Sequence, residues 1–184
     1  MEKQITPNLE LFSKEFLPAV WPGDCIGCSH TNPIGFHLHF WYQGGITWSK
    51  TTISPHFCGF NNIAHGGSVA MLLDEIGAYS LYIQCLKLAV TLNATITYYR
   101  PVPVNQDIIL AGKVVDPDPM HPRSEAGIYN LKGQLLAECK SEWRFTSAEQ
   151  LAKISGLDPQ LINTMLKQYL DPIHDYLKNL QIRP

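Results

Sequence analysis

The feature that most constrains the fold is residues 67–86, a stretch that is apolar or small at nearly every position. A helix of this length makes about five and a half turns. Only two charged residues, Asp74 and Glu75, interrupt it. A helix that is apolar on every side is buried on every side. We therefore expect a sheet to wrap this helix, or a sheet to cover one side and a partner to cover the other.

The segments around this helix alternate between apolar and polar residues, as β-strands do. Two such runs, separated by Gly44 and Gly45, precede the helix and predict a hairpin. The strand-like runs are residues 36–42 and 46–53 before the helix, and residues 90–99, 107–115, 126–129 and 135–145 after it. Residues 54–64 between them carry the proline, glycine and asparagine residues of a loop. This order of elements predicts an α+β fold with a mainly antiparallel sheet.

The two ends of the chain have a different pattern. Residues 9–20 carry apolar residues at helical spacing, and the segment after residue 146 returns to that spacing behind Asp158-Pro159, a typical helix start. A chain of 184 residues fits one domain. We expect an N-terminal leader with a short helix at residues 1–33, a central domain at residues 34–146, and a helical C-terminal extension at residues 147–184.

Charge limits the partners that the protein can have. Fourteen Lys and Arg residues against sixteen Asp and Glu residues give a net charge of −2. No basic excess is therefore present to bind the phosphates of a nucleic acid. Only 16% of the residues are charged, against about 25% in ordinary domains. This shortage suggests that a second copy of the chain covers part of the surface.

Targeting signals are not apparent in the sequence. The N-terminal residues lack the apolar core of a signal peptide, and no stretch reaches the roughly 18 apolar residues of a membrane span. The five cysteines are an odd number. We expect a cytoplasmic protein with reduced thiols and no membrane span.

His65-Gly66-Gly67 stands where the loop meets the apolar helix. The first amides of a helix have no partner within it, and the helix dipole adds partial positive charge at that end. Such an end can stabilise an oxygen that becomes negative during a reaction. The alternative is that Gly66 and Gly67 only make a tight entry to the helix.

The two carboxylates of the helix lie on neighbouring faces. Asp74 shares its face with small residues such as Ala70 and Ala78, whereas Glu75 lies on the face of Tyr82. A carboxylate in apolar surroundings has a raised pKa and is a candidate base or nucleophile. We expect Asp74 to face the positive end of its own helix. The alternatives are a hydrogen-bonded buried residue for Asp74, and an ion pair or hydrogen bond to a strand for Glu75.

These residues resemble a known family. His65-Gly66-Gly67, followed after six residues by Asp74, resembles the signature of hotdog-fold acyl-CoA thioesterases, in the branch named after the phenylacetate-pathway thioesterase. The resemblance extends over roughly residues 24–146. The further matching segments are Cys28 with residues 32–38, the Asp74-Glu75 pair, residues 90–93 leading into residues 98–103, and residues 133–138.

The resemblance implies a hotdog fold, in which a curved antiparallel sheet wraps a long central helix. It also implies a homodimer with two sites at the subunit interface, and a homotetramer stays open. The implied reaction is hydrolysis of an acyl-CoA to the free acid and CoA, without a cofactor. The alternatives from other classes are a domain that binds an acyl thioester without cleaving it, and a hydratase or dehydratase on the same scaffold.

By the same resemblance, Asp74 is the base that activates water or the nucleophile that attacks the thioester. The amide of Gly66, with that of Gly67, would polarise the thioester carbonyl. Thr91 is expected to come from the other subunit and to orient the water or Asp74. His65 would shape the loop and lie near the thioester.

We assign Glu75, Asn93 and Arg100 to substrate binding, with Asn93 near the thioester and Arg100 at the CoA phosphates. The alternatives for the last two are an ordinary polar residue of a strand and a surface charge. One position departs from the family, because several members carry an asparagine where this chain has Gly59. This departure leaves the activation of the carbonyl open.

Cys25 and Cys28 have the spacing of a zinc knuckle or of a redox pair. A zinc site of the usual kind needs two more ligands. His30, His56 and Cys58 could supply them, but no second spaced pair follows in the sequence. His37 and His39 fall on one face of an expected strand, where hydrogen-bonded or solvent-facing histidines are the common outcome. We therefore expect no metal.

Overall fold

The computed structural model describes residues 1–17 and 23–181. Its main sheet has six strands in the order β1-β2-β6-β7-β8-β5, and every neighbouring pair is antiparallel. The strands are β1 (Trp41–Gln43), β2 (Ile46–Thr52), β5 (Ala89–Tyr98), β6 (Asp107–Asp116), β7 (Arg123–Asn130) and β8 (Leu135–Phe145). The expected α+β class is confirmed.

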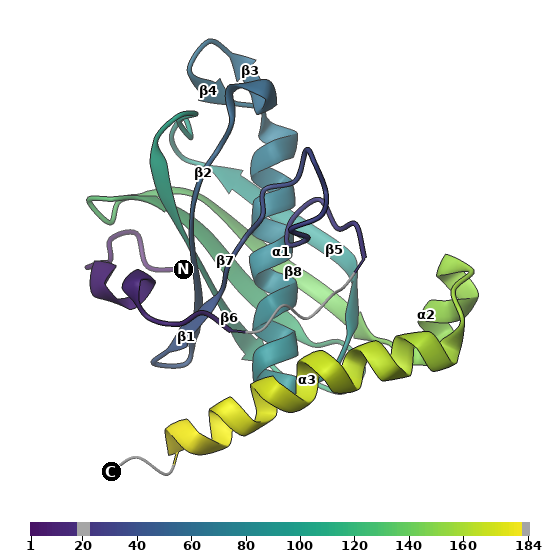
Figure 1. Ribbon diagram of the computed structural model, residues 1–184. Coiled ribbons are helices and arrows are strands. Elements are labelled where there is room, and N and C mark those ends of the chain that lie inside the picture. The colour runs from purple at the N-terminus through teal and green to yellow at the C-terminus, as the bar shows by residue number, and fades with distance from the viewer. Residues whose placement is uncertain (18–22, 182–184) are drawn as a thin grey trace.

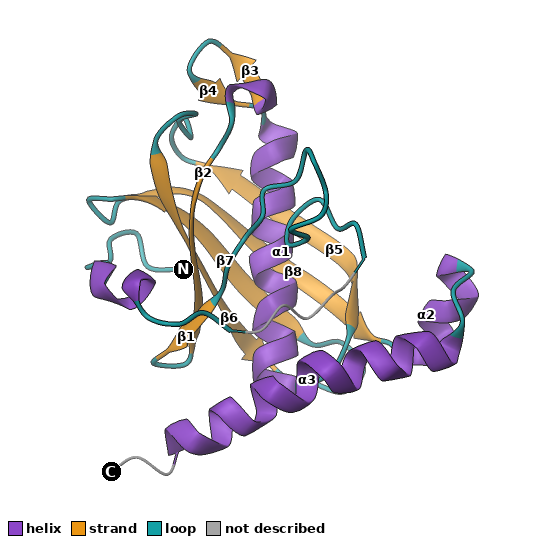
Figure 2. Ribbon diagram, viewed as in Figure 1, coloured by secondary structure: helices purple, strands orange, loops and turns teal. Residues whose placement is uncertain are grey.

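The central helix α1 (Gly66–Cys85) lies against the concave face of this sheet (Figure 1). Its side chains Leu72, Leu73 and Ile76 have no exposed surface. The chain before β1 crosses the other side of α1 (Figure 2), and its Phe40 ring stacks on Tyr79 with centroids 3.5 Å apart. The expected wrapping of the apolar helix is therefore complete within one chain over most of its length.

The remaining elements lie at the two ends of α1. At its N-terminus, the short helix η2 (Pro55–Phe57) leads into a small hairpin of β3 (Cys58–Phe60) and β4 (Ile63–Ala64). At its C-terminal end, α3 (Pro159–Gln181) crosses α1 after the short helix α2 (Ala148–Ser155) (Figure 1). Within the described ranges, no helix combines the length and the apolar character that crossing a membrane requires.

Two expectations about the first third of the chain are wrong. The strand expected at residues 36–42 shrinks to β1, because the amides of Phe36 and Leu38 donate instead to Ile26 and Gly27 in the leader. The left-handed φ of His37, 50°, also breaks the extended run. The helix expected at residues 9–20 is only the 3-10 helix η1 (Leu9–Ser13); the chain is not helical over residues 14–17, and residues 18–20 lie outside the described ranges.

Helix α1 and the sheet lie very close together at Gly112 of β6. A Cβ atom there would lie 2.5 Å from the hydroxyl oxygen of Ser80 and 2.7 Å from the carbonyl oxygen of Ile76, both on α1. A methyl group can enter only if the helix moves away from the sheet. The glycine therefore sets the depth at which α1 is seated.

We expect Gly112→Ala to lower the free energy of unfolding by about 1–3 kcal/mol, because it overpacks the contact of α1 with β6. Urea unfolding at one fixed protein concentration measures the change. The matched control is Val115→Ala in the exposed part of the same strand, for which the change should stay within about 0.5 kcal/mol. An unchanged midpoint for Gly112→Ala would mean that α1 is not seated as the structure describes.

Candidate active site

Side chains from both sides hold the N-terminus of α1 in place. His65 is the N-cap, and its Nδ1 accepts a hydrogen bond of 2.9 Å from the amide of Gly67. The hydroxyl of Tyr98, on β5, donates to the carbonyl oxygen of Gly66 at 3.0 Å. Sequence analysis did not single out Tyr98, although it lies in a segment that carries the family resemblance.

Only one of the two expected glycine amides is available to a ligand. The amide of Gly67 is already used by His65, so its expected role at a carbonyl is wrong for this arrangement. The amide of Gly66 donates no hydrogen bond to any part of the chain that the structure describes, and the residue is exposed. The first turn of α1 thus offers a single amide at its positive end.

A cavity of about 540 Å³ opens beside this helix end. The β3–β4 hairpin, the first turn of α1 and the chain from Tyr98 to Val102 line it. Its volume is in the range of small-molecule sites. Arg100 lines the cavity, is exposed, and forms no ion pair within the described residues. The cavity therefore combines a free cation with a free helix amide.

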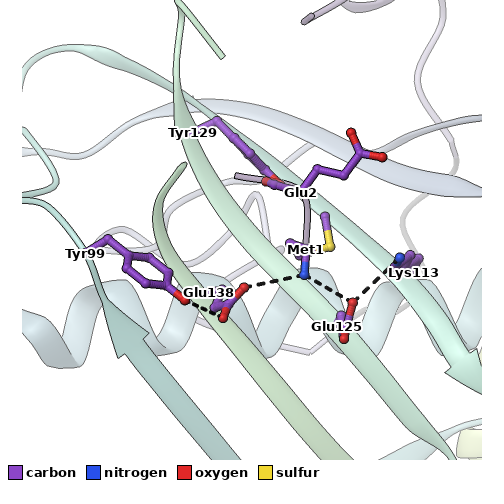
Figure 3. Close-up of polar contacts among 7 residues, drawn as sticks. All are labelled: Met1, Glu2, Tyr99, Lys113, Glu125, Tyr129 and Glu138. Atoms are coloured by element: carbon purple, nitrogen blue, oxygen red, sulfur yellow. Dashed lines mark hydrogen bonds and ion pairs between the residues drawn. The ribbon is translucent and has the colours of Figure 1, made fainter. Parts of the chain in front are cut away.

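The end of β5 that carries this cavity is anchored on both faces of the sheet. Tyr98 points inward to α1, whereas the hydroxyl of Tyr99 donates to Glu138 on the outer face at 2.7 Å (Figure 3). The other oxygen of Glu138 lies 3.4 Å from the amino group of Met1, which also contacts Glu125 at 3.2 Å. Arg100 follows these anchored residues directly, so its backbone position is well defined.

Asp74 and Thr91 form the second part of the site. The hydroxyl of Thr91, near the start of β5, donates to a carboxylate oxygen of Asp74 at 2.8 Å. Burial raises the pKa of the Asp74 carboxyl above its ordinary value, and the hydrogen bond from Thr91 opposes this rise. The contact lies within one chain, so the expectation that Thr91 reaches Asp74 from the other subunit is wrong for this pair.

The carboxylate and the free amide are far apart in one chain. Asp74 follows Gly66 by eight residues of continuous helix, which is about 12 Å along the axis. The expectation that Asp74 faces the N-terminal end of its own helix is therefore wrong. One chain contains an Asp74–Thr91 pair at one place and a Gly66–Arg100 cavity at another.

Asn93 does not join Thr91. A β-bulge places Thr91 opposite Trp143 and Asn93 opposite Glu142, so Leu92 is an extra residue in β5. Residues that oppose consecutive partners point to opposite faces of a sheet. Thr91 therefore points inward to Asp74, whereas Asn93 points to the outer, exposed face.

Glu75 lies away from both parts of the site. Its carboxylate oxygens are 3.6 and 3.5 Å from the sulfur of Cys25, and Cys28 lies in the same cluster. Burial and the nearby charge of Cys25 raise the pKa of Glu75 to about 8. A hydrogen bond from Cys28 lowers the pKa of Cys25 to about 5. The same hydrogen bond, together with burial, raises the pKa of Cys28. The structure therefore does not bring Glu75 together with Asp74 or Arg100.

The comparisons with known proteins agree with this architecture. Residues 61–116, which include α1 and β5, match the family model of the thioesterase superfamily. The chain has the hotdog fold of the thioesterase superfamily. The expected family resemblance and fold are thus confirmed.

Solved structures of this superfamily share the fold at low sequence identity. A thioesterase superfamily protein aligns with a TM-score of 0.56 and 21% identity over 61% of this chain and 58% of its own. The PaaI protein of the Escherichia coli phenylacetic acid degradation operon aligns with a TM-score of 0.54 and 19% identity over 59% of this chain and 83% of its own. A hypothetical thioesterase of Streptococcus pneumoniae TIGR4, solved with coenzyme A, aligns with a TM-score of 0.55 and 19% identity over 59% of this chain and 85% of its own. None of the curated proteins matches the sequence.

We expect Thr91→Val to raise the pKa of Asp74 further, because it removes the hydrogen bond that favours the ionised form. An NMR titration of the side-chain carboxyl carbon, assigned with Asp74→Asn, measures this pKa. Thr95→Val is the matched control, because Thr95 lies on the outer face of the same strand. An unchanged or lower pKa in Thr91→Val would show that Thr91 does not act on the carboxylate.

Proposed function

We propose that the protein hydrolyses acyl-CoA thioesters to the free acid and CoA. The hydrogen bond from Thr91 to Asp74 carries the proposal, because it orients a carboxylate whose pKa is raised by burial. Carboxylates with a pKa shifted by burial and with a specific hydrogen-bond partner are candidates for acid–base chemistry. The thioesterase superfamily match and a CoA-bound relative with this fold support the same reaction.

In this reaction Asp74 acts as the base that takes a proton from water, or as the nucleophile itself. The attack on the thioester carbon makes a tetrahedral intermediate with a negative oxygen, which the amide of Gly66 stabilises at the positive end of α1. Collapse of the intermediate breaks the carbon–sulfur bond and releases CoA as a thiolate. Where Asp74 acted as the base, the thiolate takes the proton that Asp74 removed from water. Where Asp74 itself attacked, the thiolate takes a proton from solvent, and water then hydrolyses the acyl–Asp74 anhydride to the free acid and restores the carboxylate. Before the attack, the hydrogen bond from Thr91 favours the ionised form of Asp74 and fixes the direction of its carboxylate.

Two copies of the chain complete one site. The separation of about 12 Å between Asp74 and Gly66 leaves each chain with two incomplete halves. Strand β5 is a long edge strand that pairs only with β8 among the described elements, and it exposes Leu92 by 42% and Tyr98 by 51%. Such an edge is a template for pairing with another chain. We infer a homodimer in which one chain supplies Asp74 with Thr91 and the other supplies the amide of Gly66.

Arg100 gives the cavity its preference for CoA. A guanidinium binds phosphate oxygens through two parallel hydrogen bonds, and Arg100 stands free at the cavity lip. The phosphates of CoA fit this cation, while the thioester end extends toward the first turn of α1. The acyl chain then occupies the interface between the two copies.

We expect Asp74→Asn to lower the turnover of acyl-CoA by about 10²–10⁴-fold, because it removes the base or nucleophile. Release of free thiol from short, long and aryl acyl-CoAs measures turnover, and Asp118→Asn, in an exposed loop, is the control. Retained turnover in Asp74→Asn would remove this residue from the mechanism. A wild-type protein that binds acyl-CoA tightly without turnover would instead favour the binding domain without catalysis.

The shared site is tested by complementation. Proline at position 66 removes the free amide but suits the first turn of a helix, and the preceding His65 already has the extended backbone that proline requires. We expect Gly66→Pro and Asp74→Asn each to be inactive alone. In a mixed dimer, one of the two sites has both residues intact, so random mixing restores about a quarter of the wild-type activity. No recovery in an equal mixture of co-expressed chains would contradict the shared site.

A further inference from the structure

The strongest unassigned feature is the cluster of Cys25, Cys28 and Glu75. The two sulfurs and a carboxylate oxygen all lie within 4.8 Å of one another. Within residues 1–17 and 23–181, this is the only group of three such side chains close enough to share one metal ion. It lies on a different face of α1 from Asp74 and plays no part in the proposed hydrolysis.

The distance between the Cys25 sulfur and the Glu75 carboxylate fits a tetrahedral zinc site. Zinc binds thiolate sulfur at about 2.3 Å and carboxylate oxygen at about 2.1 Å, so a sulfur and an oxygen of one tetrahedron lie about 3.6 Å apart. The sulfur of Cys25 is 3.6 and 3.5 Å from the two oxygens of Glu75. Magnesium and calcium prefer oxygen ligands, whereas two thiolates favour zinc.

The backbone of the leader is shaped around this cluster. A Cβ atom at Gly27 would lie 2.5 Å from the carboxyl carbon of Glu75, so any side chain there would force the carboxylate to move. The amide of Gly27 donates to the sulfur of Cys25 at 3.3 Å. The amides of Phe36 and Leu38 hold the carbonyl oxygens of Ile26 and Gly27 from the other side, at 2.7 and 3.0 Å. The backbone therefore positions the three side chains that would bind the metal before any ion is present.

A fourth coordination position opens into a cavity. The three residues line a pocket of about 220 Å³, together with Tyr79, Tyr82, the chain at residues 88–90, Thr146 and Leu151. No other histidine, cysteine or acidic side chain of the described residues joins the cluster. Three protein ligands with an open position are the pattern of zinc sites that also bind water or a small ligand.

We propose that Cys25, Cys28 and Glu75 bind one zinc ion per chain, with water in the fourth position facing this cavity. The ion joins the leader to α1, and the proposal does not depend on the thioesterase activity. Sequence analysis expected no metal because no second pair of spaced ligands follows Cys25 and Cys28. The third ligand comes instead from α1, 47 residues after Cys28.

The test is a titration of the full chain, reduced and stripped with a chelator, with cobalt(II) and then zinc under anaerobic conditions. We expect one equivalent of cobalt to produce a thiolate-to-cobalt charge-transfer band and the strong visible bands of a tetrahedral ion. Zinc should abolish both bands and raise the melting temperature. A chain without these bands, with all thiols shown to be reduced, would overturn the proposal.

Matched variants assign the ligands. Cys28→Ser should lower the intensity of the charge-transfer band by half or more, because only the Cys25 thiolate remains. Glu75→Gln removes a ligand and should weaken binding by at least the roughly 10-fold that loss of an outer-shell partner costs. Gly27→Ala should also weaken binding, because its methyl group displaces the carboxylate. Cys85→Ser, a partly buried thiol outside the cluster, should bind as the wild type does. Equal binding by Cys28→Ser and the wild type, or a Cys25–Cys28 disulfide whose reduced form binds no metal, would overturn the proposal.

Discussion

The seating of α1 in the curved sheet is the constraint on which the rest of the structure depends. The helix approaches β6 so closely at Gly112 that no side chain fits between them. Gly77 of the helix also lies close to β7 and β8, since a Cβ there would lie 3.0 Å from the Trp143 side chain and 3.1 Å from the Ser124 hydroxyl oxygen. The indole of Trp143 also donates to Ser124 at 2.9 Å. A helix fixed in depth and rotation by these contacts can hold polar groups at defined positions along its length.

Three different chemical environments follow from this single rigid helix. Its first turn, capped by His65, is exposed at the edge of a cavity. Asp74 lies two turns further on, beside the start of β5. Glu75 is the next residue, but the rotation of about 100° per residue points it to the leader instead. Adjacent carboxylates therefore have separate partners, a hydroxyl for Asp74 and two thiols for Glu75.

The sequence predicted those elements whose buried face shows as a regular pattern of apolar residues within one segment. The apolar run at residues 67–86 predicted α1 (Gly66–Cys85) to within one residue at each end, and the alternating run at residues 135–145 predicted β8. The run at residues 36–42 misled, because its apolar residues face α1 while its amides bond to the leader. The candidate site residues divide in the same way, into those encoded by a local motif and those that depend on distant contacts. His65 and Gly66 were found from a local motif, whereas the bulge that turns Asn93 outward and the thiols beside Glu75 depend on contacts between distant segments.

The two proposed sites differ in how many chains they need. The leader completes the zinc site within one chain, whereas the catalytic site needs a second chain at the edge strand β5. The zinc site is complete within one chain, because residues 23–40 fold back on α1 and bring both thiols to Glu75. The catalytic site cannot be complete there, since a straight helix keeps Asp74 and the amide of Gly66 about 12 Å apart whatever its side chains do. A second α1 beside the free edge of β5 is the simplest way to bring a carboxylate of one helix to the N-terminus of another. Pairing at that edge would also cover the exposed side chain of Leu92.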